Sequence, residues 1–275
     1  MRPVVEIICV GNELLIGKTL NTNAQWLAKR ITSLGLSIRR ITTVGDEVEE
    51  ISSAIQETIQ RKPSFVITTG GLGPTFDDKT LEGIAKALQR QLEIHDQALK
   101  MLEEKYRKFV EEGRMEKLEL TPPRVKMARL PEGAEPLFNP VGTAPGVIMK
   151  NNETTIVALP GVPHEMKAIF EEFLVPILKK AAGKATFFET SIEVTGCMES
   201  TIAPLIERVM HDNPYVYIKS HPKFEERVPH LELHLSTTAE ESKTARKLVG
   251  KALVQLSETI QEKGGKIKPS KRSVK

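Results

Sequence analysis

The chain has 275 residues, of which 40% are hydrophobic and 27% are charged. This length suits one large domain with a small companion, and the composition excludes a disordered or collagen-like protein. The 39 basic and 36 acidic residues leave a net charge of +3, which is too small to indicate nucleic-acid or membrane binding by itself.

The two cysteines, Cys9 and Cys197, lie far apart and show neither CxxC nor Cys/His ligand spacing. A disulfide framework and a structural zinc site are therefore both disfavoured. The apolar run near the N-terminus is short, and no stretch approaches the roughly 18 apolar residues of a membrane helix. We expect a cytoplasmic protein in a reducing compartment, with no membrane partner.

The first 180 residues alternate short apolar runs with helical patterns, which is typical of a parallel sheet wrapped by helices. The patterns predict strands at residues 4–10, 36–44 and 64–69, and helices at 22–34, 48–61, 79–88 and 95–111. Residues 124–160 are strand-like and are followed by a helix over 163–178. We expect residues 1–180 to form one α/β domain.

The hydrophobic pattern differs in residues 185–262, where it predicts a strand, a helix, two strands and a helix in that order. This order predicts a small α+β module with its helices on one side of the sheet. Residues 263–275 are basic and lack apolar spacing, so we expect a disordered tail there.

The strongest local signal is TTGGLGPTFDD, residues 68–78, between an apolar strand and a helix. Gly70, Gly71 and Gly73 allow backbone N–H groups to crowd around an anion such as a phosphate, and a plain tight turn is the alternative. The segment matches neither GxGxxG nor the Walker-type loop, which disfavours the usual dinucleotide and nucleoside-triphosphatase sites.

Two aspartates follow this loop directly. Asp77 and Asp78 would repel a phosphate unless a cation or a hydroxyl donor lay between them. A magnesium-like ion that bridges carboxylate and phosphate would remove this repulsion. The alternative role of an aspartate at this position is to cap the helix that begins near Lys79. We expect the two aspartates to divide these roles.

Further acidic residues follow the first two predicted strands. Gly11, Asn12 and Glu13 come after the first strand, and Asp46 comes after the second. Because the carboxyl ends of parallel strands converge over one crevice, these residues should face the same ligand as the glycine loop. The alternatives are that Glu13 lies on the surface and that Asp46 caps the helix at Val48.

Two loops rich in Gly and Pro, NPVGTAPG at 139–146 and LPGVPHEM at 159–166, predict a rigid wall around a flat or phosphorylated ligand. His164 and Glu165 could take part in acid/base or metal chemistry, or could only occupy the first turn of a helix. No GxSxG or HExxH motif is present, so hydrolysis by a protein nucleophile is disfavoured.

These motifs, with VGNELLIGKTLNTNAQWLA ahead of them, resemble in their order the CinA family and the wider molybdopterin-binding domain shared with MogA, MoeA and gephyrin. The resemblance covers about residues 4–180 and implies a three-layer parallel-sheet domain. The V-x-D and TGGTG-x4-D segments of the wider superfamily fall here on Asp46 and Asp78, with Leu72 in place of the threonine, as in CinA proteins. The small module resembles a KH-like companion domain.

The resemblance implies a metal-dependent pyrophosphatase of the ADP-ribose type that uses Mg, Mn or Co, with potassium. Deamidation of nicotinamide mononucleotide is not implied, because the family's C-terminal deamidase domain is not expected in this chain. We assign Asp78 and Asp46 as catalytic residues and, with Glu13, as metal ligands. The expected ligand contacts are Gly11, Asn12, Glu13, Gly70, Gly71, Gly73, Thr75, Asp77, Gly142, Thr143, Pro145 and Gly146.

The alternative function is a non-catalytic protein that binds molybdopterin or a nucleotide. In that case Asp46 and Asp78 would accept hydrogen bonds from the ligand. RNA binding through the small module is disfavoured because that module lacks a GxxG loop, so no nucleic-acid partner is expected. Relatives of the fold commonly associate, so we expect a homo-oligomer.

Overall fold

The computed structural model describes residues 3–223 and 228–270. The chain divides into two compact units. The larger unit extends to Ala182, and the smaller begins at Gly183 and also includes Ser33–Gly35.

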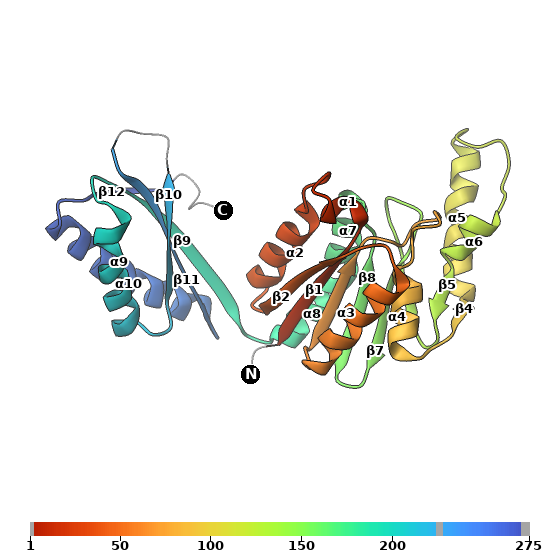
Figure 1. The fold of residues 1–275 in the computed structure, drawn as a ribbon, viewed down its shortest axis with the longest axis horizontal. Helices are drawn as coiled ribbons and strands as arrows, with labels where there is room; N and C mark the ends of the chain where they lie inside the picture. Colours follow the sequence, from red (N-terminus) through yellow and green to blue (C-terminus); the bar gives the residue numbers. More distant parts are fainter. Residues whose placement is uncertain (1–2, 224–227, 271–275) are drawn as a thin grey trace. The chain divides into compact units, whose positions relative to one another are not determined.

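The larger unit is built on a six-stranded sheet in the order β2-β1-β3-β8-β7-β6 (Figure 1). The parallel strands are β1 (Val4–Val10), β2 (Ser37–Val44), β3 (Phe65–Thr69) and β8 (Thr154–Leu159). Strand β7 (Gly146–Asn151) runs antiparallel to β8, and β6 (Glu135–Leu137) runs antiparallel to β7. A separate pair is formed by β4 (Leu92–Ile94) and β5 (Arg129–Pro131).

Helices cover both faces of this sheet. The helices of this unit are α1 (Asn12–Leu15), α2 (Thr22–Ser33), α3 (Val48–Gln60), α4 (Thr80–Leu88), α5 (Asp96–Glu111), α6 (Pro122–Lys126), α7 (Pro163–Ile169), the π-helix η1 (Phe170–Leu174) and α8 (Val175–Ala182). Of these, α5 and α6 lie beside β4 and β5 (Figure 1). Trp26 of α2 packs edge-on against Phe170 of η1, so these two helices share a face. Ile51 of α3 packs on the other face with Ile8 and Ile156. The predicted three-layer α/β class is confirmed.

Two predicted elements differ in detail. The helix predicted over 163–178 contains the π-helical turn η1, and the strand-like stretch from residue 124 begins inside helix α6. Pro122 and Pro123 occupy the first turn of α6, where the missing N–H groups would have no helical partner in any case.

The strand order places a crevice at one edge of the sheet. β1 has β2 on one side and β3 on the other, and with right-handed crossovers the connections after β1 and β2 pass over opposite faces. The loops that leave β1, β2, β3 and β8 therefore meet at their shared carboxyl edge. The loop before β7 reaches the same edge, because β7 is antiparallel to β8.

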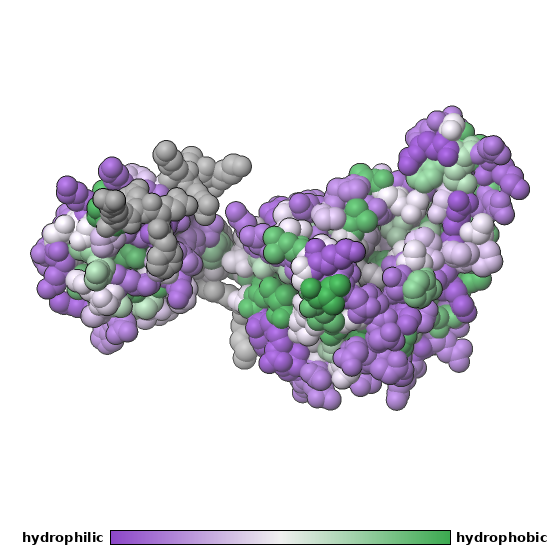
Figure 2. Space-filling view, turned by 45° about the horizontal axis from the view of Figure 1, so that its top comes forward, coloured by the Kyte–Doolittle hydropathy of each residue, from purple (hydrophilic) through white to green (hydrophobic). Residues whose placement is uncertain are grey.

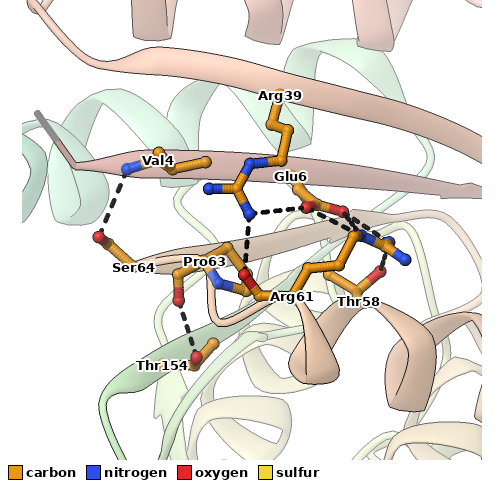
Figure 3. A network of polar contacts seen from close by, with 8 residues as sticks. All are labelled: Val4, Glu6, Arg39, Thr58, Arg61, Pro63, Ser64 and Thr154. Carbon is orange, nitrogen blue, oxygen red and sulfur yellow. Dashed lines mark hydrogen bonds and ion pairs between the residues drawn. The ribbon is translucent and has the colours of Figure 1, made fainter.

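The opposite, amino edge of the sheet holds a buried ion pair (Figure 3). Glu6 of β1 is 1% exposed, and its Oε2 lies 2.7 Å from Nη2 of Arg61. Arg61 Nε also donates to both Glu6 oxygens, at 3.1 and 3.0 Å, and Arg39 Nη1 lies 3.8 Å from Oε1. The hydrogen bond from Arg61 to Glu6 raises the pKa of Arg61. This carboxylate is neutralised within the chain.

The smaller unit is an antiparallel sheet in the order β10-β11-β9-β12. Its elements are β9 (Thr186–Thr195), α9 (Glu199–Asp212), β10 (Tyr217–Lys223), β11 (His230–Ala239), α10 (Ser242–Glu262) and β12 (Lys266–Pro269). The first five follow the predicted strand, helix, strand, strand, helix order. Val194, Leu233 and Leu256 lie in the core between sheet and helices.

The prediction of a disordered tail over 263–275 is wrong for its first part. Lys266–Pro269 form β12, which pairs with β9 from Thr195 to Ile192. Ile267 packs against the core of the unit, and this one apolar side chain between lysines was too weak a pattern to indicate a strand. The rest of the predicted tail, residues 271–275, lies outside the described residues.

The face of the larger unit seen in Figure 2 is mostly hydrophilic, with smaller separate apolar patches. Within the described chain, no helix combines the length and apolar character that a bilayer span requires.

Candidate functional site

A cavity of about 420 Å³ lies at the carboxyl edge of the large sheet. Its walls come from the loops that follow β1, β2, β3 and β8, from the start of α2 and from the loop before β7. Of the residues predicted at the site, those that line it are Gly11, Glu13, Asp46, Gly70, Gly71, Gly73, Thr75, Asp77, Asp78 and Thr143.

The glycine loop is wedged between β1 and β8. Gly70 has a φ of +107°, and a Cβ there would lie 2.1 Å from the carbonyl oxygen of Val10. Its N–H donates to Leu159 O at 3.0 Å. Only glycine combines this backbone conformation with so close an approach.

Hydrogen bonds from α4 complete the loop. Thr80 donates through Oγ1 to Gly70 O at 2.7 Å and through its N–H to Gly71 O at 3.1 Å. The N–H groups of Gly71 and Gly73 have no acceptor among residues 3–223 and 228–270. Free backbone donors in a glycine loop are the groups that bind phosphate oxygens.

The two aspartates after the loop close a turn instead of capping a helix. Asp78 Oδ2 accepts hydrogen bonds from Thr75 N at 2.8 Å and from Thr75 Oγ1 at 2.6 Å. Asp77 Oδ1 also accepts from Thr75 Oγ1, and this bond holds the pKa of the Asp77 carboxyl below its usual range. Helix α4 begins at Thr80 after Lys79 and has no side-chain cap. The predicted capping role is therefore wrong, because both carboxylates turn back toward Thr75.

Asp46 links the loop after β2 to α1. Its Oδ2 accepts from Asn12 N at 2.7 Å, and Asn12 Oδ1 accepts from Asp46 N at 3.4 Å. The residue before α3 is Glu47, whose side chain makes no capping bond, so the alternative that Asp46 caps this helix is wrong. Asn12 does not line the cavity itself but holds Asp46, whereas Glu13 is exposed and lines the cavity beside Gly11.

The Gly- and Pro-rich loop before β7 contributes fewer residues to the cavity lining than the sequence predicts. Thr143 and Ala144 line the cavity, whereas Gly142, Pro145 and Gly146 do not. Gly146 is the buried first residue of β7. A Cβ on Gly142 would lie 2.0 Å from the carboxylate of Glu165, so glycine is required there by a neighbouring side chain.

Glu165 and His164 differ although they are adjacent in the first turn of α7. Glu165 lines the cavity, and its Oε2 accepts from Asn139 Nδ2 at 2.6 Å. His164 is exposed and lies outside the lining. The sequence pattern did not distinguish the two, because Pro163 starts the helix and the helical rotation then decides which side chain faces inward.

The segment Asn21, Thr22 and Asn23 at the start of α2 was missed as part of the site, and all three residues line the cavity. Asn21 Oδ1 accepts from Ala24 N at 3.0 Å, which caps the helix. Three polar residues directly ahead of an apolar helical pattern were the signal that could have identified them.

The cavity lining is acidic in the part of the chain that the structure describes. Five carboxylates line it, and none of the other described lining residues is Lys, Arg or His; the five are Glu13, Asp46, Asp77, Asp78 and Glu165. In the described ranges, no group of three or more His, Cys, Asp or Glu side chains is placed to hold a metal ion. The predicted ligands Glu13, Asp46 and Asp78 thus share the cavity without forming a preassembled metal site, because separate loops hold them.

Comparison with known proteins identifies the family. A family model described as "Probable molybdopterin binding domain" matches residues 6–180. CinA from Thermoplasma acidophilum, described as a protein of unknown function, is 40% identical in sequence to this chain. Its crystal structure matches with a TM-score of 0.57, and the match covers 63% of this chain and 98% of that chain. The chain belongs to the CinA family. The predicted resemblance is confirmed.

Relatives of this CinA-family chain match it over almost their whole length. A protein of Sulfurisphaera tokodaii is 46% identical over 95% of this chain and 97% of its own. A protein of Pyrobaculum calidifontis is 47% identical over the same shares. The similarity therefore includes the smaller unit as well as the domain that holds the cavity.

Proposed function

We propose that this CinA-family chain binds a nucleotide pyrophosphate of the ADP-ribose type in the acidic cavity and hydrolyses it with a divalent metal ion. One observation carries the proposal: five carboxylates line the cavity beside a glycine loop whose free N–H groups suit a phosphate, and no Lys, Arg or His is among the described lining residues. Lys126 lies behind the loop, where its Nζ donates to the carbonyl oxygens of Thr75 and Asp78. The carboxylate acceptors and the backbone N–H donors thus border one cavity of a size that suits a small-molecule ligand.

Electrostatics explains why a cation belongs to this proposal. A pyrophosphate is negatively charged on both sides of its bridging oxygen, so the carboxylates alone would repel it. The N–H groups of Gly71 and Gly73 offer only partial positive charge. A cation that arrives with the ligand removes the repulsion.

The residues present fit Mg²⁺ or a similar ion that is bound together with its substrate. Mg²⁺ is usually held by one or two carboxylates plus substrate phosphates and water, without a dedicated protein cage. Asp78 beside the glycine loop and Asp46 in the loop after β2 are such carboxylates, and Glu13 is a third candidate. The ion would neutralise phosphate charge and activate water, while the chain positions the phosphates through the loop.

The test is AMP release from ADP-ribose by the purified chain with Mg, Mn or Co and with EDTA. We expect metal-dependent release that Asp78→Asn lowers by at least about 100-fold. Asparagine keeps an oxygen that can accept from Thr75, so the turn should persist. His164→Gln, at an exposed position outside the lining, is the control and should keep full activity. No release with any metal would refute the proposed hydrolysis.

A second candidate is a protein that binds a molybdopterin-like or nucleotide ligand without hydrolysing it. The side chains of the cavity are rich in hydrogen-bond acceptors, which suits a heterocycle that carries several N–H donors. This candidate predicts calorimetric binding that persists in EDTA, with no turnover of ADP-ribose under any metal.

A further inference from the structure

We infer that Glu165 and Asn23 form a subsite for a hydrogen-bond donor edge of the ligand. Two ligand groups have this chemistry: the vicinal hydroxyls of a ribose and the amino–imino edge of a pterin. The inference rests on the proposed binding of a ligand in this cavity, and it does not require hydrolysis.

Glu165 faces the cavity as an acceptor and forms no ion pair with any described residue, although the charge of Lys105 acts on it from beyond contact distance. Its Oε2 accepts one hydrogen bond from Asn139, and Oε1 accepts none from the described part of the chain. No basic nitrogen of the described residues lies within 4.0 Å of this carboxylate; Lys105 Nζ donates to Pro140 O instead, at 2.9 Å. An ionised carboxylate can accept about four hydrogen bonds, and two parallel ones when the donors form a pair.

Asn139 holds Glu165 in a fixed position. Asn139 is 2% exposed, and its Nδ2 donates to Ala144 O at 2.8 Å as well as to Glu165. Its Oδ1 accepts from the N–H groups of Val141 and Gly142, at 3.2 and 2.7 Å. The side-chain amide is thus fully used, and the carboxylate is oriented before any ligand arrives, which lowers the entropy lost on binding.

Asn23 provides the second, independent observation. It lines the cavity, is only 9% exposed, and its buried Oδ1 has no hydrogen-bond partner. The orientation of the amide is set by its neighbours. Nδ2 donates to Gly161 O at 2.7 Å, and a carbonyl can only accept.

The second neighbour of Asn23 gives the same orientation. Nδ2 also donates to Thr69 Oγ1 at 3.1 Å, and that hydroxyl in turn donates its own hydrogen bond to Pro160 O at 2.9 Å. Rotating the amide would place Oδ1 against two acceptors. A buried acceptor left without a donor is costly, and a ligand donor at this wall would remove that cost.

The two acceptors are both tied to the segment that joins β8 to α7. Asn23 is bonded to Gly161 in the loop between β8 and α7, and Glu165 is in the first turn of that helix. A phosphate would be repelled by Glu165, whereas hydroxyl or N–H donors would be attracted. The phosphates therefore belong at the glycine loop, and the donor-bearing part of the ligand belongs at this wall.

The experiment compares three probes by calorimetry with magnesium. α,β-Methylene ADP-ribose carries ribose hydroxyls and resists hydrolysis, pterin-6-carboxylate carries the amino–imino edge without a sugar, and methylenediphosphonate carries only the phosphate-like group. Glu165→Gln should weaken binding of at least one of the first two by about 10-fold or more. It should leave methylenediphosphonate binding unchanged or tighter, because one negative charge is lost.

Companion variants separate recognition from folding. Asn23→Ala should weaken the same probe by about 2- to 12-fold, Glu165→Asp should retain part of the affinity, and His164→Gln should change nothing. The probe that loses affinity identifies the source of the donor edge.

Three results would overturn the inference: equal losses for all probes, no loss in Glu165→Gln, or no binding of either donor-bearing probe by the unaltered chain. Binding of the ADP-ribose analogue with the expected losses, but without hydrolysis of ADP-ribose itself, would refute the proposed enzyme and support the subsite.

Discussion

The two edges of the large sheet differ in whether their carboxylates have basic partners within the chain. At the amino edge, Glu6 is buried and is paired with Arg61 and Arg39 (Figure 3). At the carboxyl edge, five carboxylates share one cavity whose described lining has no basic side chain. Removing one partner of a buried ion pair destabilises the fold, whereas carboxylates that line a cavity without a basic side chain in the described lining are available to a ligand. The difference separates a structural carboxylate from a candidate functional one.

The largest expected effect comes from breaking the buried pair. Glu6→Gln should lower the free energy of unfolding by about 2–3 kcal/mol, because it removes the buried charged acceptor of the hydrogen bonds from Arg61, whose own side chain is 25% exposed. Urea unfolding measures this change, and the affinity of the folded variant for methylenediphosphonate should be unaltered. A stability loss no greater than that of Asp46→Asn would contradict the proposed contrast between the two edges.

Gly70→Ala should have the next largest effect. The substitution combines a φ of +107° with a Cβ placed 2.1 Å from a backbone oxygen, so we expect a loss of about 2 kcal/mol or more and weakened binding of the phosphate probe. Gly17→Ala is the matched control, because Gly17 has a φ of +71° with nothing within 4 Å. Equal losses in both variants would show that the close approach to Val10 contributes little.

An exposed pair of the same type sharpens the comparison. Arg30 binds both oxygens of Glu171, at 2.6 and 2.7 Å, and this hydrogen bonding lowers the pKa of Glu171. Because the folded pKa is depressed, the stabilisation is present above the ordinary glutamate pKa of about 4.3 and is lost as the pH falls through the folded value.

Glu171→Gln should accordingly cost about 0.5 kcal/mol near neutral pH, since both side chains are partly exposed to solvent. Thermal unfolding at neutral pH and near pH 3 measures the difference between variant and parent, which should shrink at the lower pH. A difference that stays constant with pH would contradict the assignment to this ion pair.

The smallest effect is expected in the cavity itself. Asp46→Asn keeps an oxygen that can accept from Asn12 N and removes one of five neighbouring negative charges. Stability without divalent ions should change by less than about 0.5 kcal/mol, toward stabilisation. Chemical unfolding at low ionic strength is the measurement, and a loss of more than 1 kcal/mol would show that Asp46 is structural like Glu6.

Much of the fold was predictable because the signals are local. Val4–Val10 is almost fully buried, and a strand buried on both faces appears in sequence as an unbroken apolar run. Thr22–Ser33 and Val48–Gln60 carry apolar residues at helical spacing and were predicted to within one residue. β12 was missed because its stability comes from pairing with β9, which lies about 70 residues earlier and leaves almost no trace in the local pattern.

Within the site, what the sequence by itself determined was the set of loops. Parallel strands bring their carboxyl ends to one edge, so Gly70, Asp46 and Asp78 were expected to share a crevice, and they line one cavity. The glycine loop was recognisable because three glycines within four residues separate an apolar strand from a helix.

Only the tertiary structure decided which side chains face that cavity. It separates Glu165 from His164, turns Asp77 and Asp78 toward Thr75, and assigns Gly142 to packing against Glu165. These outcomes depend on helix rotation and on hydrogen bonds between segments up to about 140 residues apart, such as Asn23 with Gly161. The residue types of a local motif carry no record of such distant partners, which is why the lining required the folded chain.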